Sequence, residues 1–293
     1  MSGMMMGRGG EERDMAMFVN TAGGRASSLE VQNHKRVCAR GFGNAEKRPA
    51  VRAVHRDRAQ FGSSTRRVAC HQNRSLDMLG EGVKTAVLLS GGGRSLENLI
   101  VRIEQKTLTN VEIACVIASK PSAGGIERAR ARSIPTHVIR PRDFEGEDTV
   151  QRFSAAINDV LDRHAVELVV LAGWMHFYLI PTRFEHRVIN IHPSLLPSFC
   201  GKGYYGEKVH KAVLDFGAKV TGCTVHFADN QYDHGAIIVQ RPVMVEDDDT
   251  VDTLAARVFE EEKNALAQAV QLYVDKKLVL EGRRVKFAQE AAL

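Results

Sequence analysis

Hydrophobic and polar positions divide this 293-residue chain into an irregular head and a body in which apolar runs alternate with amphipathic segments. The body begins at Val83 with the run VKTAVLL, which ends in a turn of three glycines. Apolar residues then recur at the helical spacing, at Leu96, Leu99, Ile100 and Ile103. A β-prone run, a glycine turn and a helical repeat predict a strand followed directly by a helix.

The same alternation continues through the next hundred residues. We expect further strands over residues 111–119, 136–140, 166–173 and 186–193, and helices over 124–133 and 149–163. Apolar residues in the strand runs are continuous rather than alternating, which indicates strands that are covered on both faces. The sequence therefore predicts an α/β fold with a doubly wound, mostly parallel sheet.

The pattern changes again after Gly217. Two strand-like runs, KVTGCTVHFAD and GAIIVQRPVMV, flank a short polar stretch and predict an antiparallel hairpin at the far edge of the sheet. A long amphipathic helix is expected over residues 248–277, with Thr250 as its N-cap. Residues 81–293 are thus predicted to form one catalytic domain.

Charge sets the head apart from the body. Residues 1–80 hold 12 Arg and 2 Lys against 7 acidic residues, whereas the whole chain holds 40 Lys and Arg against 35 Asp and Glu. The body is near neutral, so the basic charge gives no argument for nucleic-acid binding. The head has no lasting apolar period and is expected to be disordered. Two interpretations stay open: an organellar transit peptide, or a basic segment upstream of the true translation start.

Several other classes of protein are disfavoured by the sequence. The most apolar stretch, residues 166–181, is interrupted by Glu167 and His176, so no membrane span is predicted. The five cysteines lie far apart without a C-x-x-C pair, which argues against a disulfide framework or a zinc ribbon. No two histidines have the spacing of a helical metal site, and we predict no metal.

The first candidate site is the glycine turn SGGGRS, residues 90–95, between the first strand and the first helix. Unhindered backbone N–H groups at a helix N-terminus favour an anion such as a phosphate. The spacing fits neither the dinucleotide fingerprint nor a P-loop, because Leu96 replaces the required glycine and no Gly-Lys-Ser/Thr follows. Phosphate binding and a simple tight turn both remain possible at this point.

The second candidate site is the strand end that carries Asn190 and His192. These residues lie two apart on a strand, so their side chains point to the same face. Pro193 and Pro197 end the strand at once and put the pair at its tip. An amide donor beside an imidazole can stabilise an oxyanion and move a proton, which are the two tasks of acyl transfer.

The segment NIHPSLLP, residues 190–197, resembles the signature of the folate-dependent formyltransferases, above all those that formylate phosphoribosylglycinamide in purine biosynthesis. The resemblance covers nearly all of residues 83–285. Its further motifs are SGGG at 90–93, AGWM at 172–175, GKGYYG at 201–206, VHKA at 209–212, TVHF at 224–227 and DHG at 233–235. It implies a Rossmann-like formyltransferase fold and transfer of the formyl group of 10-formyltetrahydrofolate to the amine of 5-phosphoribosylglycinamide.

The resemblance also implies roles for individual residues. His192 would be the catalytic imidazole, Asn190 would polarise the formyl carbonyl, and Asp233 would lie beside His192 and relay a proton. A carboxylate beside an imidazole favours the charged ring, so the three roles are physically coherent. On its residues alone, Asp233 is better explained as a turn aspartate.

Two binding sets follow from the same resemblance. Contacts to the ribonucleotide are implied for Gly93, Arg94, Ser95, Pro193 and Glu262, and contacts to the folate for Met175, His176, Phe177, Tyr178 and Asn190. Arg94, Ser95 and His176 depart from the residues that are usual in the family. For the four residues of the folate segment, packing at a strand end is the alternative, and for Glu262 it is a solvated helix face.

The GKGYYG segment is most similar to the plant-type members, some of which carry plastid transit peptides. The resemblance therefore implies a chloroplast location, with mitochondrion or cytoplasm as alternatives. The implied partners are the two small-molecule substrates, without nucleic acid or membrane, for a monomer or a homodimer. Three other functions are the alternatives: a formyltetrahydrofolate deformylase, a transferase acting on initiator tRNA, and a non-catalytic folate- or nucleotide-binding module.

Overall fold

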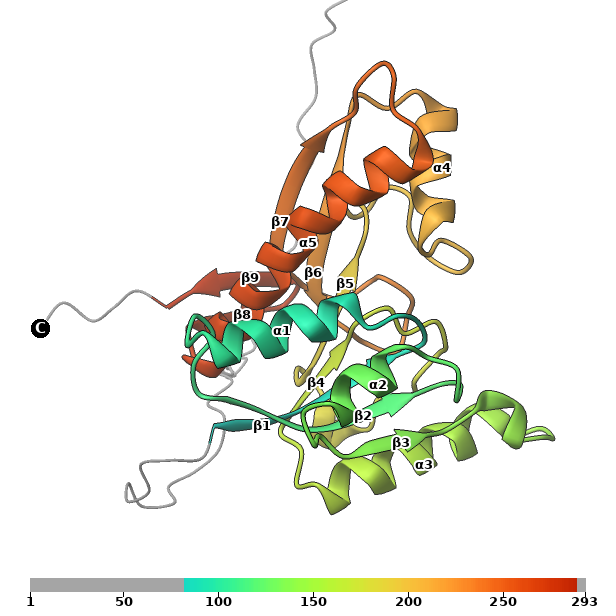
Figure 1. The fold of residues 1–293 in the computed structure, drawn as a ribbon, viewed down its shortest axis with the longest axis vertical. Helices are drawn as coiled ribbons and strands as arrows, with labels where there is room; N and C mark the ends of the chain where they lie inside the picture. The colour runs from blue at the N-terminus through green and yellow to red at the C-terminus, as the bar shows by residue number, and fades with distance from the viewer. Residues whose placement is uncertain (1–81, 289–293) are drawn as a thin grey trace, which may run out of the picture. The chain divides into compact units, whose positions relative to one another are not determined.

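The computed structural model describes residues 82–288. The predicted N-terminal extension over residues 1–80 lies outside these residues. Within them, the strands form a single sheet in the order β3-β2-β1-β4-β5-β6-β7-β9-β8 (Figure 1).

The bounds of the elements are as follows. The strands are β1 (Val83–Leu89), β2 (Val111–Ala118), β3 (Thr136–Val138), β4 (Leu168–Leu171), β5 (Val188–His192), β6 (Val220–Phe227), β7 (Ile237–Met244), β8 (Leu278–Glu281) and β9 (Arg284–Phe287). The helices are α1 (Arg94–Glu104), α2 (Gly125–Arg130), α3 (Thr149–Arg163), α4 (Glu207–Phe216) and α5 (Val251–Val274), with short 3-10 turns η1 (Pro141–Asp143) and η2 (Thr182–Phe184).

The first five strands form the parallel half of the sheet and confirm the doubly wound prediction. Alternate side chains of β1 enter different cores: Val87 and Leu89 pack on the side of α1, α2 and α5, and Ala86 and Leu88 on the side of α3. This two-sided burial explains the continuous apolar runs. Figure 1 shows α1 and α2 on one face of these strands and α3 on the other.

The strand order reverses at β1. The chain passes from β1 to β2 and β3 on one side and then to β4 and β5 on the other. In sheets of this kind the loops at the carboxyl ends of the strands diverge at the reversal and leave a crevice, where ligands bind. The glycine turn after β1 and the residues after β4 and β5 all lie at this edge.

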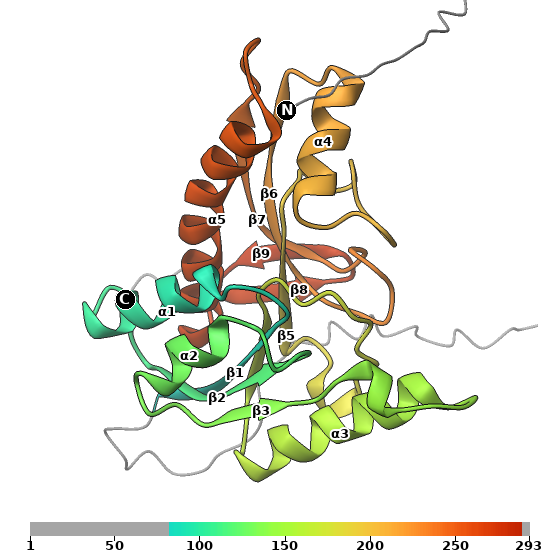
Figure 2. The ribbon, with the colours of Figure 1, turned by 45° about the vertical axis from the view of Figure 1, so that its right-hand side comes forward.

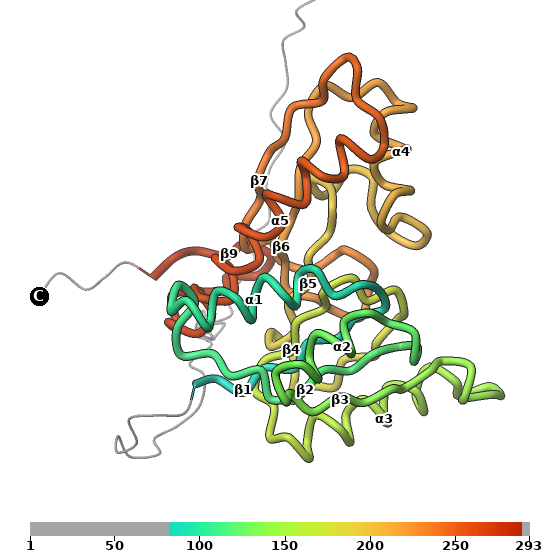
Figure 3. The backbone as a smooth tube through the Cα atoms, in the orientation of Figure 1, coloured from blue at the N-terminus to red at the C-terminus, as the bar shows by residue number. Residues whose placement is uncertain are grey.

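The second half of the sheet is antiparallel at β5–β6 and at β6–β7. The hairpin of β6 and β7 was predicted from the sequence, whereas the antiparallel pairing of β5 with β6 was not. Helix α5 packs along β6 and β7, and Figures 2 and 3 show these three elements side by side. The sequence analysis did not predict β8 and β9. This short hairpin pairs with β7 at Ile237 and Arg284 and forms the edge of the sheet.

Helix boundaries follow the capping chemistry. Thr250 is the N-cap of α5, as predicted, and its hydroxyl accepts from the N–H of Thr253 at 3.2 Å while the Thr253 hydroxyl accepts from the N–H of Thr250 at 2.9 Å. Helix α3 has the predicted bounds. Among the helices of residues 82–288, none is both long and apolar enough to span a bilayer.

Candidate active site

The predicted pair of Asn190 and His192 lies at the end of β5, on a face that it shares with β6. The antiparallel register places Asn190 opposite His226 and His192 opposite Thr224. Alternate residues of paired strands point to the same face, so four polar side chains meet there. The sequence analysis assigned no role to Thr224 or His226, although their spacing of two within the TVHF motif was the available signal.

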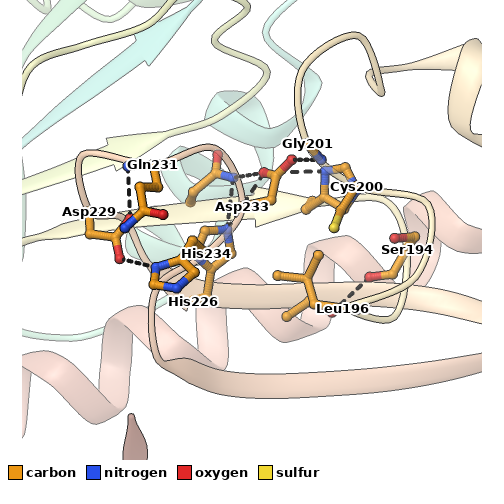
Figure 4. Close-up of polar contacts among 12 residues, drawn as sticks. Ser194, Leu196, Cys200, Gly201, His226, Asp229, Gln231, Asp233 and His234 are labelled. Atoms are coloured by element: carbon orange, nitrogen blue, oxygen red, sulfur yellow. Dashed lines mark hydrogen bonds and ion pairs between the residues drawn. The ribbon is translucent and has the colours of Figure 1, made fainter. Parts of the chain in front are cut away.

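Asp233 reaches this pair from the loop between β6 and β7. Its Oδ1 lies 3.6 Å from Nδ1 of His192 and 3.4 Å from Nδ2 of Asn190. Its Oδ2 accepts a hydrogen bond from the backbone N–H of Gly201 at 2.9 Å, and Figure 4 shows the two residues facing one another. The carboxylate is largely buried, with 11% of the side chain exposed. The structure therefore brings together the three residues predicted to be catalytic.

The hydrogen-bond partners fix which ring nitrogens carry hydrogens. Nε2 of His192 lies 2.9 Å from the carbonyl of Phe199, which can only accept, so Nε2 carries a hydrogen. Nδ1 is the ring nitrogen that faces Asp233. Nδ1 of His226 donates to the Phe227 carbonyl at 2.8 Å, which leaves Nε2 to accept from Asn190 Nδ2 at 3.0 Å. Burial lowers the pKa of His226, so the neutral ring orients the amide of Asn190.

Thr224 holds the segment that follows His192. Its buried hydroxyl donates to the carbonyl of Ser194 at 2.7 Å and accepts from the N–H of Leu196 at 3.0 Å and from Nε2 of Gln240 at 3.0 Å. Ser194 in turn donates through its own hydroxyl to the carbonyl of Ser198 at 2.5 Å. These bonds fix the path of the chain from His192 to Gly201, which contacts Asp233.

His210 of α4 is a further buried residue that the sequence analysis left without a role. Only 4% of it is exposed, and within residues 82–288 its Nδ1 has no hydrogen-bond partner. Burial, with a smaller contribution from His192, lowers its pKa to about 4. A lone histidine in an apolar repeat gives no sequence signal that would separate this position from an ordinary core residue.

The glycine turn at the end of β1 has the geometry of a main-chain anion site. Gly93 is the N-cap of α1 with φ of 73°, and a Cβ there would lie 2.5 Å from the Cα of Gly125. The space beside Gly91 and Gly92 is open. Nε of Arg128 fixes the turn by donating to the carbonyl of Gly92 at 2.8 Å. The first N–H groups of α1 have no acceptor within the helix, so they are available to a ligand.

Arg94 and Glu262 lie together beside this turn. The guanidinium of Arg94 lies 4.1 Å from the ring centroid of Phe259 on α5, one turn before Glu262. Burial raises the pKa of Glu262 to about 7, while the charge of Arg94 acts in the opposite direction. The neighbouring acids are engaged elsewhere, Glu260 with Lys263 and Glu261 with Arg241. Of the three acids, Glu262 is the one whose pKa the charge of Arg94 lowers.

The remaining two residues of that set adjoin the same edge. Ser95 is half-buried in the first turn of α1, and Pro193 directly follows His192. The ribonucleotide set thus extends from the start of α1 to the end of β5. Its role in binding stays a prediction.

The predicted folate segment follows β4. Ser90 accepts at its hydroxyl from the N–H of Met175 at 3.1 Å, which ties this segment to the glycine turn. Half of Met175 is exposed, and the ring of Phe177 contacts Tyr232, the neighbour of Asp233, with centroids 5.2 Å apart. The ring of Phe177 therefore lies beside the loop that carries Asp233.

The other two side chains of the segment turn inward. Tyr178 is buried, and its hydroxyl donates to Asn158 at 2.6 Å. His176 packs edge-on against Trp174 and Phe153, and burial lowers its pKa. The side chains of both residues therefore pack within the protein, as the alternative of packing at a strand end predicted.

No group of three or more His, Cys, Asp or Glu side chains within residues 82–288 is arranged to hold a metal ion. A cavity of about 540 Å³ lies at the amino ends of the parallel strands, where Lys84, Arg132 and Arg163 contribute to its lining. It is at the edge of the sheet opposite to Asn190, His192 and Asp233.

Comparisons with known proteins agree with this geometry. Residues 83–270 match the family model for formyl transferase. The trifunctional purine biosynthetic protein adenosine-3 of Gallus gallus is 44% identical over 192 residues, which are 65% of this chain and 18% of that protein. The chloroplastic phosphoribosylglycinamide formyltransferase of Vigna unguiculata is 39% identical over 201 residues, which are 67% of this chain and 62% of the relative.

A solved structure extends the comparison to the fold. Glycinamide ribonucleotide transformylase 1 from Symbiobacterium toebii matches with a TM-score of 0.66 at 35% identity, over 74% of this chain and 99% of the other. This chain spans less than two thirds of the length of the two curated relatives. The family match nevertheless covers β1 to α5 with every residue of the candidate site, and the chain belongs to the formyl transferase family.

Proposed function

We propose that the protein is a phosphoribosylglycinamide formyltransferase, which transfers the formyl group of 10-formyltetrahydrofolate to the amine of 5-phosphoribosylglycinamide in de novo purine (IMP) biosynthesis. The observation that carries the proposal is the position of Asp233 Oδ1, 3.6 Å from His192 and 3.4 Å from Asn190. The glycine turn after β1 supplies a phosphate site at the same edge of the sheet. The names of the relatives support the same assignment.

Formyl transfer begins with attack of the ribonucleotide amine on the formyl carbon, and an oxyanion forms. Asn190 is one donor at this position, and the charged ring of His192, with a hydrogen on Nδ1 as well as on Nε2, would be the second. Asn190 donates to His226 at 3.0 Å and more weakly to Asp233 at 3.4 Å, so its second hydrogen can turn to the formyl oxygen. Preorganised donors of this type are worth about 10² to 10³ in rate each.

Proton transfer completes the reaction. The attacking amine loses a proton, N10 of the folate gains one, and the bond between N10 and the formyl carbon breaks. Asp233 and Nδ1 of His192 face one another at 3.6 Å, which suits them to carry this proton. The carboxylate stays oriented because Gly201 binds its other oxygen.

Ribonucleotide binding is assigned to the edge between β1 and α5. The N–H groups at the start of α1, with Gly93, Arg94 and Ser95, would hold the phosphate. Arg94 adds a positive charge that Phe259 holds in place. Glu262 would accept hydrogen bonds from the ribose hydroxyls in its ionised form, and Pro193 would border the ribonucleotide beside His192.

Folate binding is assigned to the segment after β4. Met175 and Phe177 offer apolar side chains, while His176 and Tyr178 offer main-chain groups, and Asn190 lies at the formyl end. The co-substrate is 10-formyltetrahydrofolate, and the proposed reaction uses no metal.

The decisive experiment follows the loss of 10-formyltetrahydrofolate with and without the ribonucleotide. We expect loss that depends on the ribonucleotide, with formation of the formylated product. If 10-formyltetrahydrofolate is lost equally fast without the ribonucleotide, water is the acceptor, and the result would support a deformylase instead. Binding of folate without any turnover would support a non-catalytic module. The phosphate-binding turn and the pair of Arg94 and Glu262 favour the transferase, because water as acceptor needs neither.

We also propose that the protein acts in the chloroplast, because the Vigna unguiculata relative is chloroplastic. A fluorescent protein that carries residues 1–80 at its N-terminus should enter plastids. Location of this fusion in mitochondria or cytoplasm would overturn the proposal.

A chain that begins at Leu79 should keep full activity. Its sedimentation would distinguish a monomer from a homodimer.

A further inference from the structure

The loop between β6 and β7 holds Asp233 in an uncommon conformation. Asp233 has φ of 49°, in the left-handed region that residues other than glycine rarely adopt. Such a conformation persists where the surroundings determine it, and these positions cluster at functional sites. The contacts of the neighbouring loop residues therefore bear on the position of the carboxylate.

One side of the loop is tied to Ile180, two residues after the predicted folate segment. The side-chain amide of Asn230 accepts from the N–H of Ile180 at 2.7 Å and donates to the carbonyl of the same residue at 3.1 Å. Asp229 accepts from the N–H of Gln231 at 2.9 Å through one carboxylate oxygen. Its other oxygen remains for a partner further along the loop.

That partner is His234, which follows Asp233 directly. Nδ1 of His234 donates to Oδ2 of Asp229 at 2.7 Å, as Figure 4 shows. On the other side of the ring, the guanidinium of Arg283 lies 2.5 Å from Nε2 and also donates to the His234 carbonyl at 2.5 Å. Arginine can only donate and a carboxylate can only accept, so the ring is held as the neutral tautomer with hydrogen on Nδ1.

Arg283 belongs to a part of the chain for which the sequence predicted neither an element nor a site. It lies in the turn between β8 and β9, the hairpin that the sequence analysis did not predict. The hairpin joins the sheet through the pairing of Arg284 with Ile237 of β7, close to the end of the catalytic loop. A bidentate arginine at this point fixes both the ring and the main chain of His234.

We propose that Arg283 and His234 are positioning residues, which hold Asp233 in reach of His192 through the chain Arg283–His234–Asp229. This inference rests on the proposed function, because the position of Asp233 matters only for the proton that Asp233 moves. The β8–β9 hairpin is then a part of the active site, although none of its residues reaches the reacting atoms.

The test compares kinetic constants of full-length variants. Arg283→Ala should lower kcat roughly tenfold, since a small displacement of a catalytic group is costly, and should leave the KM for the ribonucleotide within about twofold. Arg283→Lys keeps a single donor nitrogen and should recover only part of kcat. Arg284→Ala is the matched control, because it alters the neighbouring arginine of the same hairpin, and should match the wild type.

A double variant separates positioning from general stability. In an Asp233→Asn background, Arg283→Ala should change kcat by less than about twofold, because the carboxylate that Arg283 positions is no longer present. Multiplication of the two effects, or an unaffected kcat in Arg283→Ala, would overturn the inference. If Arg283→Ala fails to fold, His234→Asn makes the same comparison with the hairpin intact.

The outcome is independent of the acceptor. If the wild type consumes formyl-folate equally well without the ribonucleotide, the proposed function fails, and the same kcat comparison is made on the hydrolysis. Asp233 would serve either reaction, so the positioning inference is still decided.

Discussion

The parallel and antiparallel halves of the sheet present their functional groups in different ways. In the parallel half, the turn around Gly93 offers main-chain N–H groups, and its shape depends on the absence of side chains. Where β5 meets the antiparallel half, the predicted catalytic groups are the side chains of Asp233 and His192, which polar contacts with Gly201 and Phe199 orient. The main-chain site tolerates an unusual side chain such as that of Arg94, but it does not tolerate a Cβ added at Gly93. The side-chain site tolerates little change in the polar groups around it.

The largest effect is expected at the side-chain site. His192→Ala should lower kcat by about 10² or more, because acid–base and oxyanion contributions are each of that size. Asp233→Asn should have a comparable effect. Steady-state assays with both substrates would measure it. A loss confined to the KM of either substrate would show that the two residues only bind.

The main-chain site should fail for a different reason. In Gly93→Val a branched side chain meets both a φ of 73° and the Cα of Gly125 at 2.5 Å, so the free energy of unfolding should fall by roughly 2 to 4 kcal/mol. The KM for the ribonucleotide should rise more than that for the folate. Gly91→Ala is the matched control, because its surroundings are open. An unchanged ribonucleotide KM in Gly93→Val would mean that the turn is no phosphate site.

Thr221 and Thr224, two buried threonines of β6, test how much the side-chain hydrogen bonds of the antiparallel half contribute to stability. Thr224→Val removes a hydroxyl with three partners and should lower the free energy of unfolding by about 1 to 3 kcal/mol. Thr221 is equally buried, yet its hydroxyl has no partner within residues 82–288. Thr221→Val should therefore be neutral or stabilising in urea titrations. Equal losses for both variants would show that the bonds of Thr224 contribute nothing.

The smallest effect concerns the pH dependence at Glu262. Its pKa is raised from 4.5 to about 7 by burial, so its contribution to stability is complete below pH 4.5 and is lost as the pH rises through about 7. Glu262→Gln should therefore melt at a higher temperature than the wild type at pH 8.5, with little difference at pH 4.5. The control is Glu260→Gln, which changes an exposed acid of the same helix. A melting difference that is the same at both pH values would contradict the raised pKa.

Glu262→Gln should also raise the KM for the ribonucleotide, because the amide has one acceptor oxygen where the carboxylate has two. Stability and binding then change in opposite directions at alkaline pH. This opposition is expected of a buried acid that serves a ligand rather than the fold.

Much of the parallel half could be predicted from the sequence. Strands that are buried on both faces must be apolar throughout, so β1 to β5 could be predicted from continuous apolar runs. An amphipathic helix must carry apolar residues with a period of 3.6, so α3 could be predicted from that spacing. The cap at Thr250 was visible for the same local reason. The hairpin of β8 and β9 was missed because its strands have four residues each and are only partly buried, which leaves no apolar run.

The sequence by itself determined which residue types were available at the strand ends: a glycine turn after β1, Asn190 and His192 on one face of β5, and Asp233 in a turn. These follow from periods of two and 3.6 residues and from turn chemistry, which are local. Only the tertiary structure decided that Asp233 turns toward His192, that His226 orients Asn190, and that Arg283 holds the loop. These contacts join residues 36 to 49 positions apart, and strand register and loop path, which depend on packing of the whole sheet, set their geometry.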